Sequence, residues 1–375
     1  MSGIYIHIPF CKKVCYYCDF HFSVSLRNIE DTVKCIISEI ELRRDYLKDA
    51  KVKSVYFGGG TPSVLDVSSV EQILSEVHRH HAVENNAEVT FEANPDDIDS
   101  EYLASLKNAG INRLSLGVQS FFDEDLIWLN RRHNGNDSYR SIVRCMEAGF
   151  ENVNIDLLYG IPGMDGRRWL ENLKKALSLP VKHLSAYLLT IEPKTVFGHY
   201  YKKGKIKEID DDTAIEHFNI LKGYLVDKGF IHYEISNFAL PGFFSRHNCS
   251  YWSMEEYLGV GPSASSYNGY SRQWNIWNNS LYVDEIKSGR LPFEKEILSL
   301  REQYNEYILT SLRTMWGADL KFIRDFFGET YEKYCLLMAR NFIENGQLKK
   351  EEEKLKLTDI GQQLTDYITC SLFAA

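Results

Sequence analysis

Three cysteines near the start of the chain have the residue type and spacing of a metal-binding site. Cys11, Cys15 and Cys18 follow the pattern CxxxCxxC. Cysteine thiolates of this kind hold iron–sulfur clusters, and a four-iron cluster normally takes four of them. A motif with only three cysteines leaves one iron free to bind a small chelating molecule, such as the amino and carboxylate groups of a methionine. The motif therefore predicts a [4Fe–4S] cluster with one open iron.

Zinc is the alternative metal for three closely spaced cysteines. A Cys3His zinc site could take its fourth ligand from His7 or His21. Structural zinc sites, however, usually contain CxxC pairs, and the CxxxCxxC spacing is uncommon for them. The iron–sulfur interpretation is therefore favoured over zinc.

The composition argues against several classes of protein. The 375 residues include 43 Lys and Arg against 52 Asp and Glu, a net charge of −9. A chain this acidic is a poor general nucleic-acid binder, because phosphate contacts need clustered cations. No apolar run reaches the ~20 residues that span a bilayer, and the N-terminus lacks the pattern of a signal peptide. We therefore expect a cytoplasmic protein; a peripheral membrane contact is the alternative, although no strongly basic amphipathic segment indicates one.

Cysteines in a cytoplasmic protein are rarely paired in disulfides, and a tight group of them is typical of metal binding or catalysis. The cysteines outside the motif are scattered along the chain. We expect them to be small buried side chains, with Cys249 left open because of its neighbours. They are Cys35, Cys145, Cys249, Cys335 and Cys370.

Short β-rich runs alternate with amphipathic segments over the first half of the chain. Apolar residues at helical spacing predict a helix over residues 31–48, for example. Strand–helix alternation of this kind indicates a parallel sheet of βα units, which fits a partial (β/α)6 barrel. A doubly wound open sheet is the competing interpretation. The expected strands are residues 3–8, 54–57, 88–92, 113–118, 152–158 and 183–189.

Polar or glycine-rich residues follow every one of these runs and favour the barrel. In a (β/α) barrel the carboxyl ends of the strands meet at one face, where active sites are found. The cysteines follow the first run, Gly-Gly-Gly-Thr-Pro at residues 58–62 follows the second, and the later runs end at Glu92, Gln119, Asp156 and Tyr187.

The pattern changes after the last of these strands, and we expect three regions. The barrel covers residues 1–235, an aromatic-rich segment covers 236–295, and a small winged-helix-like module of helices and a charged hairpin covers 296–375. Lys349 and Lys350 lie beside three glutamates in that hairpin. Mixed charge argues against a phosphate-binding surface, so a structural or docking module is expected rather than a DNA-binding one.

The cysteine motif and the glycine run together resemble the radical S-adenosylmethionine (SAM) superfamily. The sequence Tyr-Ile-His-Ile-Pro-Phe-Cys at residues 5–11 resembles one branch of it, the oxygen-independent coproporphyrinogen III dehydrogenase and its HemW-type relatives, which are haem chaperones. The resemblance extends over nearly the whole chain. It implies a radical SAM partial barrel that holds a [4Fe–4S] cluster through Cys11, Cys15 and Cys18.

The resemblance also implies where SAM binds. Glycines allow close approach of the backbone to a ligand, carboxylates can accept from the ribose hydroxyls or the amino group, and an arginine can pair with the carboxylate. Tyr17 is expected beside the cluster. The implied SAM contacts are Tyr5, Tyr17, Gly59, Gly60, Thr61, Glu92, Gln119, Arg131 and Asp156.

A second motif, HNxxYW, is associated with haem in the HemW-type branch. Histidine is the commonest proximal ligand of haem, and two aromatic rings supply a flat surface for a porphyrin. Seen alone, such a motif is more often an ordinary aromatic-rich loop, and the resemblance reverses that preference. Cys249 is a second candidate haem ligand. The implied haem contacts are His247, Asn248, Cys249, Tyr251 and Trp252.

Further features separate the chaperone from the dehydrogenase. The dehydrogenase pattern has a fourth cysteine two positions after the third, where this chain has Phe20. The dehydrogenase also has a long extension before its first strand, whereas the first expected strand of this chain begins at residue 3. The favoured function is a haem chaperone that binds [4Fe–4S], SAM and haem, and delivers haem to an acceptor such as a membrane-associated respiratory enzyme. A cluster-dependent homodimer is a further implication. The alternative is radical oxidative decarboxylation of a porphyrinogen, and a zinc protein with a winged-helix module is the outlier.

Overall fold

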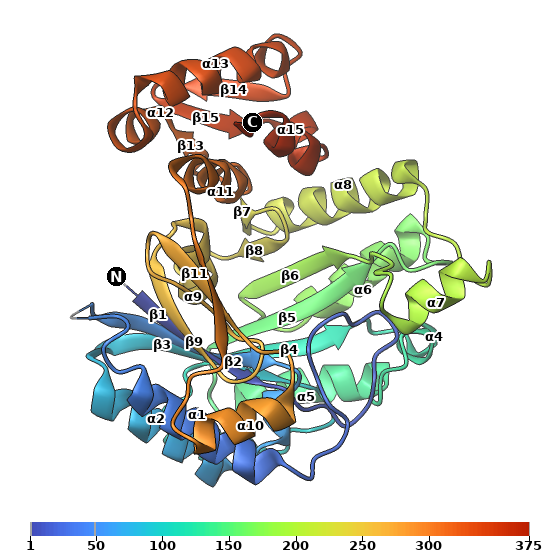
Figure 1. The fold of residues 1–375 in the computed structure, drawn as a ribbon. Helices are drawn as coiled ribbons and strands as arrows, with labels where there is room; N and C mark the ends of the chain where they lie inside the picture. Colours follow the sequence, from blue (N-terminus) through green and yellow to red (C-terminus); the bar gives the residue numbers. More distant parts are fainter. Residues whose placement is uncertain (1, 49, 375) are drawn as a thin grey trace.

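A parallel sheet of six consecutive strands forms the centre of the molecule (Figure 1). The computed structural model describes residues 2–48 and 50–374. Each strand pairs in parallel with the next one along the chain. The strands are β1 (Ser2–Ile8), β2 (Val52–Gly59), β3 (Val83–Ala93), β4 (Arg113–Gln119), β5 (Asn152–Tyr159) and β6 (His183–Leu188). Because the order never reverses, the sheet is singly wound, and the predicted partial (β/α)6 barrel is confirmed over the doubly wound alternative.

Helices connect these strands and cover the outer face of the sheet (Figure 1). In α2 the buried residues Val70, Ile73, Leu74 and Val77 follow helical spacing and face the core. Burying each of these side chains contributes about 1.5–3 kcal/mol. The helices are α1 (Ile29–Leu42), α2 (Val67–His80), α3 (Ser100–Asn108), α4 (Asp123–Trp128), α5 (Gly135–Glu147), α6 (Gly166–Leu177), α7 (Val196–Lys202) and α8 (Asp211–Asp227), with the short 3-10 turn η1 (Pro62–Val64) after β2.

Aspartate and asparagine side chains fix where several of these helices begin. Asp66 accepts a hydrogen bond from the Ser69 N–H at the start of α2, and Asn134 and Asp137 form a reciprocal capping box at the start of α5. Such caps satisfy N–H groups that have no partner inside the helix and contribute about 1 kcal/mol each.

Further strands extend the sheet beyond both ends of the barrel. Next to β6 lie β8 (Asn237–Ala239) and β7 (Ile231–Glu234), which form one antiparallel hairpin, so the expected boundary at residue 235 falls inside it. Next to β1 lies β9 (Glu256–Val260), a seventh parallel strand that the sequence analysis did not expect. Antiparallel strands β10 (Ser265–Tyr267), β11 (Ser271–Asn275) and β12 (Phe293–Ile297) follow it.

A buried polar network attaches this added part of the sheet to the barrel. Glu39 of α1 is fully buried and forms an ion pair with Arg43 at 2.8 Å. The same carboxylate accepts hydrogen bonds from Tyr282 Oη at 2.6 Å and from Asn275 Nδ2 at 2.8 Å. Tyr282 belongs to α10 (Asn279–Lys287), so the network joins α1, β11 and α10.

The C-terminal residues form a module with a hydrophobic core of its own (Figure 1). Its helices pack around a small three-stranded sheet that contains the predicted charged hairpin. The elements are α11 (Leu300–Leu312), β13 (Ala318–Asp319), α12 (Leu320–Phe322), η2 (Ile323–Phe327), α13 (Glu329–Glu344), β14 (Leu348–Glu351), β15 (Lys354–Leu357), α14 (Asp359–Gln362) and α15 (Thr365–Ser371). Over residues 2–48 and 50–374, no helix is long and apolar enough to cross a membrane.

Candidate functional site

The three cysteines of the CxxxCxxC motif lie on the loop that follows β1. All three are unpaired and partly buried. The Cys11 N–H donates to the Ser23 carbonyl at 2.9 Å, which holds the start of the loop against its end. The Cys18 N–H donates to the Cys15 carbonyl at 3.2 Å, which forms a tight turn between these two residues. The fold therefore presents the motif as a compact loop at the carboxyl end of the first strand.

Two of the cysteine sulfurs accept hydrogen bonds, one from the loop after β2 and one from the loop between α4 and α5. Thr61 Oγ1 donates to Cys11 Sγ at 3.3 Å, and Arg131 Nη1 donates to Cys15 Sγ at 3.3 Å. Asn94 connects these donors, because its Nδ2 donates to Thr61 Oγ1 at 3.3 Å and its Oδ1 accepts from Arg131 Nη2 at 2.6 Å. Asn94 was not among the site residues expected from the sequence; its place directly after β3 was the one available signal.

Burial keeps two thiols of the motif protonated while no metal is bound. It raises the pKa of Cys11 to about 12, with the Thr61 hydrogen bond opposing the shift, and raises the pKa of Cys18 to about 11. Iron ions supply the positive charge that deprotonates a coordinating thiol. Cysteine thiolates are the ligands that a four-iron cluster takes, so the donor set fits the cluster.

The glycine run after β2 packs tightly against β1 and the residues that directly follow it. Gly59 has φ +108°, and a Cβ there would lie 2.6 Å from the His7 ring. A Cβ on Gly60 would lie 2.8 Å from the backbone nitrogen of Phe10. Any side chain at either position would collide with His7 or Phe10, so glycine is needed at both positions even without a ligand.

Two partly buried carboxylates inside the barrel, Glu92 and Asp156, come from the strands on either side of β4. Tyr56 Oη donates to Glu92 Oε1 at 2.7 Å, and Asn154 Nδ2 donates to Asp156 Oδ1 at 2.8 Å. Burial raises the pKa of Glu92 to about 7, and the negative charge of Asp156 adds to the shift. Burial also raises the pKa of Asp156. Near neutral pH the Glu92 carboxyl can therefore accept or donate a hydrogen bond.

The remaining expected SAM residues lie close to the same face. Tyr5 stacks on Tyr56 with ring centroids 6.1 Å apart. Tyr17 lies beside Arg131 and the cysteines, and burial raises its pKa. Gln119 ends β4 with φ +66°, a strained value for a residue with a side chain. Most of the expected cluster and SAM residues thus lie at or just after the carboxyl ends of the barrel strands, whereas Tyr5 lies in the middle of β1 and Arg131 follows α4.

The HNxxYW residues form a short helix, α9 (Arg246–Trp252), with His247 packed inside the molecule. His247 is 1% exposed, and its ring stacks on Tyr56 at 5.0 Å. Its Nδ1 shares a hydrogen bond with Ser54 Oγ at 2.8 Å, and its Nε2 shares one with Tyr251 Oη at 2.8 Å. Burial lowers the pKa of His247 to about 3. Ligation of haem iron by His247 therefore requires one of these bonds to break and the ring to become exposed.

The residues of α9 face two different cavities. Tyr251 and Trp252 line a cavity of about 490 Å³, whereas Arg246 and Cys249 line a second one of about 380 Å³. Cys249 follows His247 by two positions, which turns its side chain about 200° around the helix. Cys249 therefore lines a different cavity from Tyr251 and Trp252, and Asn248 lines neither cavity.

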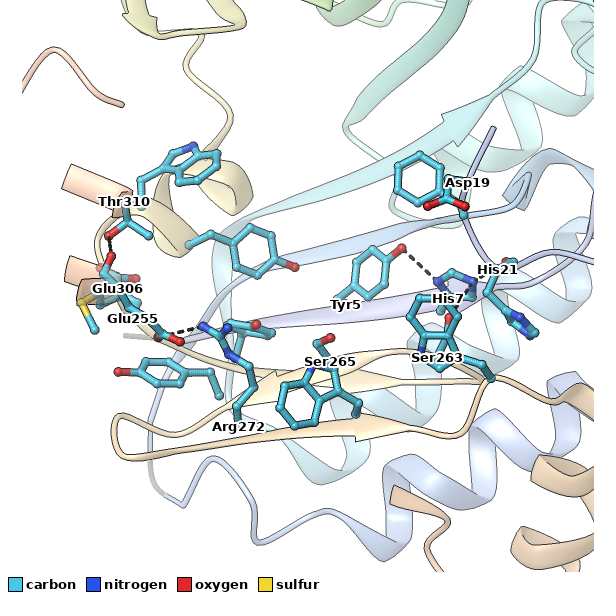
Figure 2. A pocket seen from close by; sticks show the side chains of 18 residues that line it. Tyr5, His7, Asp19, His21, Glu255, Ser263, Ser265, Arg272, Glu306 and Thr310 are labelled. Atoms are coloured by element: carbon cyan, nitrogen blue, oxygen red, sulfur yellow. Dashed lines mark hydrogen bonds and ion pairs between the residues drawn. The ribbon is translucent and has the colours of Figure 1, made fainter. Parts of the chain in front are cut away.

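The larger cavity is an aromatic pocket between the cysteine loop, β9 to β11 and α11, and we call it the aromatic cavity. Figure 2 shows Arg272, Glu255 and Glu306 at one end of it and His7 and His21 at the other. The guanidinium of Arg272 forms an ion pair with Glu306 at 2.8 Å, whereas its Nε and Trp252 Nε1 are buried and have no hydrogen-bond partner among the described residues. Its aromatic wall consists of Tyr5, Phe20, Tyr251, Trp252, Tyr257, Tyr267, Trp274 and Trp277.

The fold and the cysteine loop define a protein of the radical SAM superfamily. Residues 5–176 match the family model for the radical SAM superfamily, and residues 298–364 match that for the HemN C-terminal domain. Heme chaperone HemW of Bacillus subtilis (strain 168) is 33% identical over 97% of both chains. Heme chaperone HemW of Lactococcus lactis subsp. lactis is also 33% identical, over 97% of this chain and 95% of its own. Within the superfamily, the chain belongs to the HemW family.

A solved structure shares the whole fold. The coproporphyrinogen III oxidase HemN from Escherichia coli superimposes with a TM-score of 0.86 over 100% of this chain and 90% of its own, at 22% identity. The likeness supports the barrel and the C-terminal module as one architecture.

Proposed function

We propose that this chain is a haem chaperone, which binds haem in the aromatic cavity and passes it to acceptor proteins such as a membrane-associated respiratory enzyme. The observation that carries the proposal is the cavity wall, which is rich in aromatic side chains and also contains Arg272, paired with Glu306 at 2.8 Å. Haem has a flat apolar ring that can stack on the aromatic side chains, and carboxylates that can pair with the arginine in exchange for Glu306. The names of the curated relatives support the same ligand.

The proposal includes a [4Fe–4S] cluster held by Cys11, Cys15 and Cys18. When bound, this group supplies one-electron chemistry and an open iron site for SAM. Thr61 and Arg131 would donate hydrogen bonds to the sulfurs, which stabilises their negative charge and tunes the reduction potential. Asn94 would hold both donors in place.

The proposal also includes SAM beside the cysteine loop. Glu92 and Asp156 are available as acceptors inside the barrel, and Gln119 ends the strand between them. Arg131 is already directed at Cys15, Asn94 and the Gly117 carbonyl, so a SAM carboxylate would compete with these partners. The proposed SAM residues are the set inferred above: Tyr5, Tyr17, Gly59, Gly60, Thr61, Glu92, Gln119, Arg131 and Asp156.

A haem titration tests the proposal directly. The full chain is purified without oxygen, its cluster is reconstituted, and haem is added while the Soret band is recorded. We expect stoichiometric binding that weakens about tenfold in Arg272→Gln and in Trp252→Ala, because each removes a donor or a packing surface. Arg290→Gln is the control, because Arg290 forms an exposed ion pair with Glu285 and does not line the cavity. Equal affinity in all four proteins would contradict haem binding at this cavity.

A parallel assay covers the alternative function. The loss of coproporphyrinogen III is measured with SAM and a reductant present. Turnover without haem binding would identify the chain as a dehydrogenase.

The cluster-dependent homodimer is tested by size-exclusion chromatography with light scattering, with and without the cluster.

A further inference from the structure

Three histidines near the aromatic cavity differ in how their ring nitrogens are used. His7 Nδ1 bonds Tyr5 Oη at 3.2 Å and its Nε2 bonds the His21 carbonyl at 3.0 Å, and His247 uses both nitrogens as described above. Both rings are almost completely buried, with exposed fractions of 5% for His7 and 1% for His247. Neither histidine presents a nitrogen to a ligand in the cavity.

His21 is different on each of these points. Its ring is only partly buried and lines the cavity at the same end as His7 (Figure 2). Its Nε2 shares a hydrogen bond with Asn279 Oδ1 at 2.7 Å, and no hydrogen bond to its Nδ1 is found within the described part of the chain. Metal-ligating histidines usually have one nitrogen held by an oxygen acceptor, which fixes the orientation of the ring. Asn279 supplies that acceptor for His21.

The surroundings of His21 offer the surface that a porphyrin ring needs. Phe20 and Trp277 line the same cavity, and they remain 73% and 63% exposed. The centroid of the Trp277 ring lies 6.3 Å from that of His21. Large aromatic side chains exposed together around a pocket are typical of a ligand site, because burying them is favourable. A flat ligand over His21 would cover both side chains.

We infer that the axial ligand of haem iron in the aromatic cavity is His21, and that His247 instead supports the wall through Tyr251. The inference rests on the proposed function, because it places a ligand on haem in that cavity. Ligation by Nδ1 leaves the Asn279 bond intact, and ligation by Nε2 exchanges that single bond for the iron. Ligation by His247 would break a buried bond and expose a buried ring.

Spectra of the haem-loaded protein test the inference. The full chain, His21→Ala, His247→Gln and the control His78→Ala are loaded with ferric haem, and absorption and electron paramagnetic resonance spectra are recorded. His78 is exposed on α2 and does not line the cavity. We expect His21→Ala alone to lose the imidazole signature, with about tenfold weaker binding. Added imidazole is expected to restore the signature in that variant. Unfolding midpoints check that each variant is folded.

The possible outcomes distinguish a failure of His21 as the ligand from a failure of the proposed haem binding. If His247→Gln loses the imidazole signature and His21→Ala keeps it, the inference is overturned and haem binding stands. If all variants keep the signature, His21 is again not the ligand. If the unaltered protein binds no haem, both the proposed function and the inference are wrong.

Discussion

At the scale of single residues, the cysteine loop and its donors show what a sequence can and cannot reveal. The three cysteines were predictable because their spacing is local, within one loop. Asn94 was not, because its role depends on Thr61 and Arg131, which lie far from it in the chain and meet it only in the folded barrel. Hydrogen-bond partners of this kind have no local signature.

The sequence also does not show whether a histidine nitrogen is free to bind a ligand. The HNxxYW motif predicted His247 as a haem ligand, and in the fold that ring is enclosed between Ser54, Tyr56 and Tyr251. The role of His247 at haem stays a prediction, which the spectra described above decide.

The pKa of Glu92 predicts a pH dependence of stability. Its folded value of about 7 lies above the ordinary value of 4.5, so between these pH values the folded protein binds more protons than the unfolded chain. Stability gained from the neutral form is present at low pH and is lost as pH rises through 7. Glu92→Gln removes this loss, so at pH 8 it is expected to be up to about 3 kcal/mol more stable than the unaltered protein.

Urea unfolding of the ligand-free protein between pH 5 and pH 8 measures this difference. The gap between the two proteins should shrink toward pH 5. A gap that stays constant across this range would show that the Glu92 carboxyl does not titrate there.

At the scale of elements, alternation of strands and helices made the barrel predictable. All six expected strands overlap the observed β1 to β6, because buried parallel strands leave compact apolar runs between amphipathic helices. β9 was missed because it is short, contains glycine and pairs with β1, which lies at the opposite end of the sequence. The aromatic cavity depends on β9 to β11, so it could not be foreseen either.

The buried network at Glu39 makes a prediction about how these added strands are attached. Tyr282→Phe removes the hydroxyl that donates to Glu39 and leaves a buried carboxylate oxygen with one donor fewer. We expect a loss of about 1–3 kcal/mol in the free energy of unfolding. Lys287→Ala is a matched control, because it breaks an exposed ion pair to Asp31 between the same two helices and should cost clearly less than Tyr282→Phe. Equal effects of the two changes would contradict the importance of the network.

At the scale of the whole molecule, both aromatic and polar contacts join two hydrophobic cores. Glu234 of β7 is 2% exposed and forms an ion pair with Arg313 at 3.2 Å. Arg313 directly follows α11 of the C-terminal module. Arg313→Ala would leave this carboxylate buried without its cation, so we expect a cost of about 3 kcal/mol.

The thermal unfolding midpoint measures the effect of Arg313→Ala. Lys222→Ala is the comparison, because the pair of Lys222 and Asp359 also joins barrel and module but its carboxylate is 88% exposed. We expect Lys222→Ala to change stability by less than about 1 kcal/mol. A larger effect of Lys222→Ala than of Arg313→Ala would contradict the assignment of Glu234 as the main polar link.

The bonds of His247 connect the aromatic cavity to the interior of the barrel. Tyr251 lines the cavity, His247 bonds Tyr251 on one side and Ser54 on the other, and Ser54 belongs to β2, the strand that leads to the glycine run. A ligand that displaced Tyr251 would disturb a chain of hydrogen bonds that ends on the strand beside the cysteine loop. Thermodynamic linkage makes such coupling reciprocal: whatever factor one ligand applies to the affinity of the second, the second applies to the first. Binding of a ligand inside the barrel would then change the affinity of the cavity for its own ligand, and the reverse would hold by the same factor.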